Sequence, residues 1–99
     1  MRHRLPRKDQ LLYRRCDEVL HYLWDPIGIS SEPAARDEYL AYLPALFRLV
    51  HGKSDAASIQ QFLLHIESER MGLRPDSARA MTIAEVLIAS REWIWAQQE

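Results

Sequence analysis

The sequence predicts an all-α fold, a compact antiparallel bundle of about four helices in one domain spanning residues 1–99. Apolar residues recur at three- and four-residue spacing over most of the chain, which is the period of a helix face. Alternation at period two, the pattern of a half-buried strand, is never sustained. Ninety-nine residues with 47% hydrophobic content suit one core, and the helical stretches are joined by short connections.

The first helix is predicted to begin at Pro6 or Arg7 and to end at Trp24. Proline is well suited to a first helical turn, where its missing N–H has no helical partner. The residues before it, 1–6, are predicted to form a flexible basic tail. The apolar stripe of this helix comprises Leu12, Cys16, Val19, Leu20 and Leu23.

A sharp corner is predicted where this helix ends, and its structural motif is Trp24, Asp25, Pro26 and Gly28. The residue before a proline is pushed out of the α region, and glycine accepts the positive φ that other residues avoid. The carboxylate of Asp25 is expected to cap the next turn or to pair with an arginine.

The second helical segment is predicted over residues 34–50, after the stretch Ser30-Ser31-Glu32-Pro33, which offers a serine cap and an early proline. Pro44 interrupts it. Either the helix kinks there, or a short turn at about 34–42 precedes a helix that restarts at Pro44, and we favour the break. The expected stripe comprises Leu40, Leu43, Phe47 and Val50.

The third helix is predicted from Asp55 to Met71, capped by Ser54 and ended by Gly72. Its stripe comprises Ile59, Phe62, Leu63 and Ile66. The fourth is predicted to start at Pro75, Asp76 or Ser77 and to end near Gln97. It is apolar on more than one side, so it either lies centrally or exposes an apolar face near its C-terminal end.

The net charge of −1 conceals an asymmetry between the first 15 residues and the rest. The first 15 carry six basic residues and one acidic residue, whereas the remainder carries seven basic and thirteen acidic residues. An acidic body repels phosphates, so nucleic-acid binding is disfavoured and a basic protein partner is favoured. Apolar runs are too short to span a membrane, and no export signal is evident. With one cysteine, these features predict a cytoplasmic protein.

Candidate chemistry is sparse, and neither a catalytic motif nor a cofactor or metal site is predicted. The strongest alternative is a metal or tuned-base site formed by Asp17, His21 and Asp25, which are spaced four residues apart. Cys16 is expected to be a small buried hydrophobe rather than a nucleophile. Glu67 is expected to pair with Arg70 on a solvated helix face.

Four short blocks of the sequence form a combination that is more specific than any one of them alone. They are Trp24-Asp25-Pro26-Ile27-Gly28-Ile29, Asp37-Glu38-Tyr39, Tyr42-Leu43-Pro44 and Ile66-Glu67-Ser68-Glu69-Arg70-Met71-Gly72-Leu73. Together they resemble a family of small bacterial proteins of unassigned function that share the pattern W-D-P-I-G-[IV], and the similarity covers about residues 16–90. The resemblance implies a single helical domain in a bacterial cytoplasm and brings no catalytic residues, and some members are similar to immunity proteins that neutralise toxins.

These observations favour a non-enzymatic protein-binding module, in its most specific form an immunity protein that neutralises a basic toxin. The alternative is a small metal-dependent enzyme or regulator that uses Asp17, His21 and Asp25. Self-association into a homodimer is a third alternative. Trp93 and Trp95 are the predicted partner contacts, because residues two apart on a helix point in different directions and at least one ring must face outward.

Overall fold

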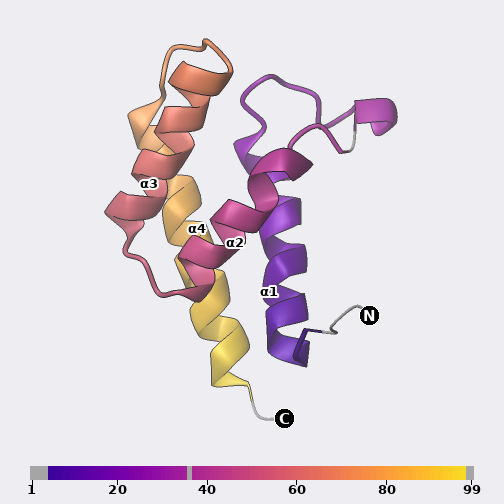
Figure 1. Ribbon diagram of the computed structural model, residues 1–99, viewed down its shortest axis with the longest axis vertical. Coiled ribbons are helices and arrows are strands. Elements are labelled where there is room, and N and C mark those ends of the chain that lie inside the picture. Colours follow the sequence, from indigo (N-terminus) through magenta and orange to yellow (C-terminus); the bar gives the residue numbers. More distant parts are fainter. Residues whose placement is uncertain (1–4, 36, 98–99) are drawn as a thin grey trace.

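The computed structural model describes residues 5–35 and 37–97, and in these residues the chain forms α-helices and shorter helical turns without a strand. The α-helices are α1 (Arg7–Glu18), α2 (Leu43–His51), α3 (Ala56–His65) and α4 (Ser77–Ala96). They run alternately up and down the molecule, so that α1 begins and α4 ends at the same end (Figure 1). The predicted all-α antiparallel bundle is confirmed.

Two of the helices continue into turns of wider winding. Helix α1 runs into the π-helix η1 (Val19–Trp24), and α3 runs into the π-helix η4 (Ile66–Arg70). The wider winding appears in the closing hydrogen bonds, since the N–H of Asp25 donates to the carbonyl of Leu20 at 3.1 Å. The predicted helix ends at Trp24 and Met71 agree with the structure to within one residue, but the change in winding was not predicted.

The segment between η1 and α2 is a loop with two short 3-10 turns, η2 (Pro33–Ala35) and η3 (Leu40–Tyr42). Helix α2 starts at Leu43 with Pro44 in its first turn, which confirms the favoured break. The serine cap predicted within Ser30-Ser31-Glu32-Pro33 is wrong, because only the 3-10 turn η2 and no α-helix begins there. Leu40 does not join the stripe and is 44% exposed, since the 3-10 winding before α2 directs the neighbouring Tyr39 inward instead.

The N-termini of α3 and α4 are both capped by aspartate. The carboxylate of Asp55 accepts the N–H of Ser58 at 2.9 Å, so the predicted Ser54 cap is wrong by one residue. Asp76 accepts the N–H of Arg79 at 3.0 Å and caps α4 as one of the predicted starts requires. Gly72, which follows η4, has a φ of +66° and turns the chain towards α4.

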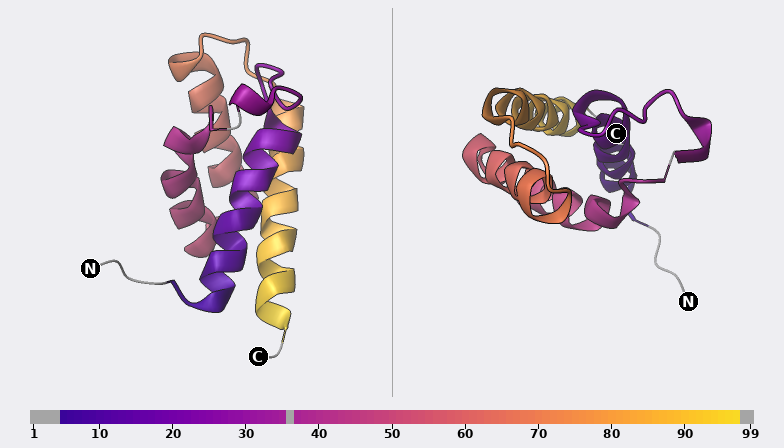
Figure 2. Two further views of the ribbon diagram at one scale, coloured as in Figure 1. Left: turned by 90° about the vertical axis from the view of Figure 1, so that its right-hand side faces the viewer. Right: turned by 90° about the horizontal axis from the view of Figure 1, so that it is seen from above.

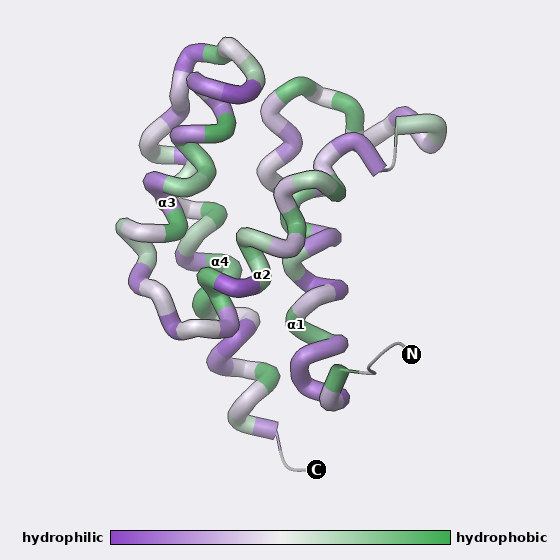
Figure 3. Tube along the Cα trace, in the orientation of Figure 1, coloured by the Kyte–Doolittle hydropathy of each residue, from purple (hydrophilic) through white to green (hydrophobic). Residues whose placement is uncertain are grey.

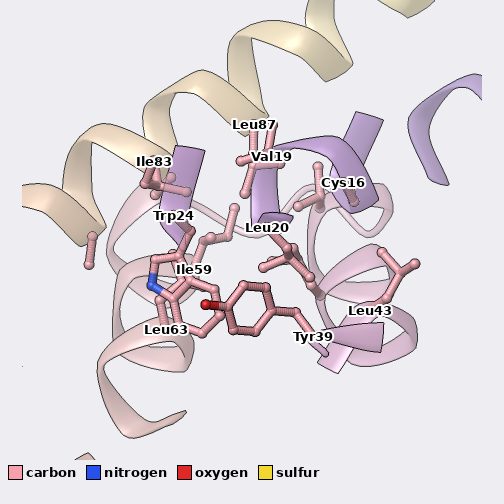
Figure 4. Close-up of a cluster of buried hydrophobic side chains, with 14 of the residues drawn as sticks. Cys16, Val19, Leu20, Trp24, Tyr39, Leu43, Ile59, Leu63, Ile83 and Leu87 are labelled. Carbon is pink, nitrogen blue, oxygen red and sulfur yellow. The ribbon is translucent and has the colours of Figure 1, made fainter. Parts of the chain in front are cut away.

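One hydrophobic core joins all four helices, and hydropathy along the trace shows the apolar positions recurring on each helix (Figure 3). Trp24 and Tyr39 lie side by side in it, with ring centroids 5.4 Å apart (Figure 4). Other buried members, contributed by every helix, include Leu12, Cys16, Leu20, Leu46, Val50, Ile59, Leu63, Ile83 and Leu87.

Most of the predicted basic tail, residues 1–4, lies outside the described residues. Within the described ranges, no helix combines the length and the apolar character needed to cross a membrane.

Candidate protein-binding surface

The corner after η1 is organised by the carboxylate of Asp25. It accepts the N–H of Ile29 at 2.8 Å, the N–H of Ser30 at 3.1 Å and the hydroxyl of Tyr39 at 2.8 Å. Burial alone would raise the pKa of Asp25, but these three donors together lower it below its usual value. Asp25 therefore caps the turn that follows, one of the two roles expected for it. Gly28 completes the corner with a φ of +69°.

The prediction that Glu67 pairs with Arg70 on a solvated helix face is wrong. Glu67 is buried and only 3% exposed. Its Oε2 accepts the indole N–H of Trp24 at 2.7 Å, and its Oε1 accepts the backbone N–H of Asp76 at 2.9 Å. A buried carboxylate is stable only when its oxygens are satisfied in this way. The hydrogen bonds join η4 to η1 and to the start of α4.

Arg79 completes a polar network with Trp24, Glu67 and Asp76 at this end of the bundle, which we call the joint. Its guanidinium donates to the carbonyls of Leu23 and Trp24, at 2.8 and 2.6 Å, and so satisfies acceptors at the C-terminal end of η1. Trp24, Asp25, Glu67 and Arg79 are all occupied by contacts within the chain. We therefore interpret this network as the joint that fixes the corner.

The Asp17, His21 and Asp25 site proposed as an alternative is not formed. The change to π winding at Val19 alters the four-residue stacking, and the carboxylate of Asp25 is directed into the corner. His21 is buried edge-on to the ring of Tyr22, with centroids 4.5 Å apart. Among the residues that the structure describes, no three His, Cys, Asp or Glu side chains form a group that could hold a metal ion.

The remaining candidate nucleophile, Cys16, is fully buried in the core, and burial raises the pKa of its thiol to about 12. A thiol this reluctant to ionise is a poor nucleophile, which agrees with its predicted role as a small hydrophobe.

An apolar groove of about 630 Å³ runs between α1 and α4, which lie side by side along one side of the molecule (Figure 2). Its α1 wall comprises Leu11, Arg14, Arg15 and Glu18, and its α4 wall comprises Val86, Ala89, Ser90, Trp93 and Ile94. We call this the α1–α4 groove. A smaller hollow of about 280 Å³ shares Arg15 and Glu18 with it and extends to the exposed Tyr22 and Leu23.

The groove exists because α4 is apolar on two sides. Ala80, Ile83, Ala84 and Leu87 face the core, whereas Val86, Ala89 and Trp93 line the groove. The sequence offered two alternatives for this helix, a central position or an exposed apolar face near its C-terminal end. The structure combines them, because α4 packs against the other three helices and also presents Trp93 to solvent.

The two C-terminal tryptophans lie in different environments. Trp93 is 65% exposed on the wall of the groove. Trp95 is 40% exposed and lies edge-on to the ring of His51, 5.8 Å away between centroids. Lys8 donates to the carbonyl of Gln97 at 2.8 Å, which holds the end of α4 against the start of α1. Trp93 is therefore the more available of the two predicted contacts.

Four of the acidic residues that the structure describes have roles within the fold. The carboxylates of Asp25 and Glu67 accept hydrogen bonds in the corner and between η4 and η1, and Asp55 and Asp76 are helix caps. The rim of the groove carries both signs, with Arg15 and Glu18 forming a 3.5 Å ion pair.

Comparisons of the chain with protein-family models, with curated proteins and with solved structures find no match.

Proposed function

We propose that this protein is a non-enzymatic protein-binding module and that its binding surface is the α1–α4 groove with Trp93. The observation that carries the proposal is a 630 Å³ apolar groove whose wall holds a tryptophan that is 65% exposed. Contiguous exposed apolar surface on a small protein marks an interaction site more often than an accident of sequence. Tryptophan is also the residue most enriched at binding hot spots.

The shape of the groove favours a helical partner surface. Side chains of one helix pack into the grooves between the side chains of its neighbours, and the α1–α4 groove, lined by residues of two adjacent helices, offers such a seat. The floor is apolar, while Arg14, Arg15 and Glu18 supply charge at the rim. An interface built like this has an apolar centre and a polar edge, which is the usual anatomy of protein–protein contacts.

The most specific form of this proposal is an immunity protein that neutralises a toxin. Its support is the resemblance of the corner and the 66–73 block to the bacterial family described above. Neutralisation requires a rigid complementary surface and no catalysis, which suits a bundle whose polar network is occupied internally. The mixed charge of the groove favours a partner segment of mixed charge over a strongly basic one.

The test uses the products of the genes adjacent to this one, because immunity proteins are usually encoded beside their toxins. Each product is titrated with the wild-type chain, with Trp93→Ala and with the control Leu40→Ala, which removes an exposed apolar side chain elsewhere. We expect Trp93→Ala to weaken binding by a factor of ten or more, as for a hot-spot residue at about 2 kcal/mol, while Leu40→Ala has little effect. Binding that is indifferent to Trp93→Ala would show that the groove is not the binding surface.

A further inference from the structure

We propose that the partner seated in the α1–α4 groove is a second copy of this chain, packed about a two-fold axis. The inference rests on the general form of the proposed function, a binding surface at the α1–α4 groove, and it names a second copy of the chain rather than a toxin as the occupant. Two-fold homodimers are the commonest assemblies of soluble proteins, and each needs one surface that is complementary to itself. The outer surface of α1 and α4 around the groove meets this requirement in shape, in polarity and in charge.

The shape is self-complementary because a projection and a recess lie on the same face. Trp93 projects from α4 with 65% of its surface exposed, and the recess lies beside it between α4 and α1. A two-fold rotation places the Trp93 ring of each copy against the groove of the other. Both large apolar features are then covered at once, and neither copy is left with an open groove.

The centre of the α4 wall is built for close approach. Ala89 and Ser90, one turn before Trp93, are small enough to let another helix approach the backbone. The hydroxyl of Ser90 donates to the carbonyl of Val86 at 2.9 Å within its own helix. Covering Ser90 in an interface therefore leaves no unsatisfied donor, so burial at this position has no hydrogen-bond penalty.

The charges at the rim can also pair between two identical copies. Arg14, Arg15 and Glu18 lie on the same wall within about one helical turn. When two α1 helices meet antiparallel across a two-fold axis, Arg14 of each copy approaches Glu18 of the other, which already pairs with Arg15 of its own chain. Within the described part of the chain, Arg14 has no ion-pair partner of its own, so it is the natural cation for this contact.

The size of the face is sufficient for a specific dimer. A 20-residue helix such as α4 is about 30 Å long, and two adjacent helices are about 20 Å wide, which gives a face of about 600 Å². Stable interfaces bury from about 600 Å² per partner upwards. A dimer through α1 and α4 therefore falls at the lower end of the range for stable complexes, so its assembly should respond to concentration.

The experiment is sedimentation velocity of the full chain from low to high micromolar concentration. We expect the wild type to shift from the mass of one chain to that of two. Trp93→Ala removes the projection, and Ala89→Glu places a charge in the groove at an exposed helix position where glutamate is well tolerated. Both should weaken the dimer by a factor of ten or more. The control Ala57→Glu, at an exposed position on α3, should dimerise like the wild type.

Circular dichroism verifies that each variant is folded before its mass is interpreted. A wild type that stays monomeric at every concentration overturns the dimer, and the groove is then left to a different protein, which the adjacent-gene titration tests separately. A dimer that persists in both Trp93→Ala and Ala89→Glu overturns the groove as the dimer surface, and the adjacent-gene titration then tests the proposed function separately. Loss of the dimer in both groove variants, with retention in Ala57→Glu, supports the inference.

Discussion

Glu67 shows how one side chain can hold distant segments together. It lies four residues after Leu63 and eight after Ile59, so it continues the buried stripe of α3 into η4 with a carboxylate in place of an apolar group. Its two oxygens accept from Trp24 and Asp76. Without it the indole N–H of Trp24 would be unsatisfied in the core, and the part-buried N–H of Asp76 would lose its acceptor.

We expect Glu67→Gln to destabilise the protein by about 1 to 3 kcal/mol. The amide has nearly the same volume but replaces one acceptor with a donor, so either the Trp24 indole or the Asp76 N–H faces another N–H. Urea unfolding measures the loss. The control Glu69→Gln, two residues away and exposed, should stay within about 0.5 kcal/mol of the wild type. Equal stability of the two variants would contradict the role assigned to Glu67.

Gly28 tests the backbone of the corner. A Cβ added there meets no atom within 4 Å, so the strain of a substitution comes from its φ of +69° alone. We expect Gly28→Val to destabilise by about 1 to 3 kcal/mol, because a β-branched residue strongly disfavours positive φ. Gly28→Asn should cost less, since asparagine tolerates this region. Thermal melting compares the three proteins, and an unchanged melting temperature for Gly28→Val would argue against a strained corner.

Asp25 makes part of the stability depend on acid pH. Its pKa is lowered in the folded state, so its contribution is fully present above the unfolded value of about 3.9 and is lost as pH falls towards the lower folded value. We expect Asp25→Asn to be less stable than the wild type at neutral pH and this difference to shrink below about pH 4. Unfolding curves across this range provide the measurement. A difference that stays constant into strong acid would exclude the charged capping role.

At the scale of the element, the start of α3 distinguishes two adjacent candidates for its cap. Asp55 accepts the N–H of Ser58, and this hydrogen bond lowers the pKa of the Asp55 carboxyl. We expect Asp55→Ala to lower the melting temperature and Ser54→Ala to leave it nearly unchanged. The reverse order of effects would show that the cap lies one residue earlier than the structure places it.

The helices could be predicted because the information is local. Apolar periodicity along α1 and α3, and the punctuation by Pro44, Gly72 and Asp76, act within a few residues of each other. The joint could not be predicted, because Trp24 and Glu67 are 43 positions apart and nothing local pairs them. One sign was present in the sequence, since Glu67 falls at a stripe position. The exposure of Leu40 was missed because 3-10 winding breaks the period on which the stripe was built.

The candidate surface was predicted only in part. The pattern of α4 indicated apolar residues on more than one side and an outward tryptophan, which places Trp93 among the candidates. The α1 wall, with Leu11 and Arg14, depends on which neighbour α4 packs beside, and that is a property of the tertiary fold.

For the whole molecule, we expect chelators to leave the melting temperature unchanged. The stability of the bundle is assigned to its core and to the joint, and His21 lies buried against aromatic rings. A drop in melting temperature after treatment with EDTA, reversed by added metal, would restore the metal-dependent alternative. Protein prepared without a histidine tag is needed for this measurement.

The three tryptophans give the molecule a built-in optical readout. Trp24 is fully buried and hydrogen-bonded to a carboxylate, Trp95 is shielded on one side by His51, and Trp93 is open to solvent. A water-soluble quencher such as iodide should therefore reach Trp93 first and Trp24 only after unfolding. Occupation of the groove should remove the Trp93 part of the quenchable emission, and leave the partly exposed Trp95 and the blue-shifted Trp24 component unchanged. One fluorescence titration can thus separate association from loss of structure without any label.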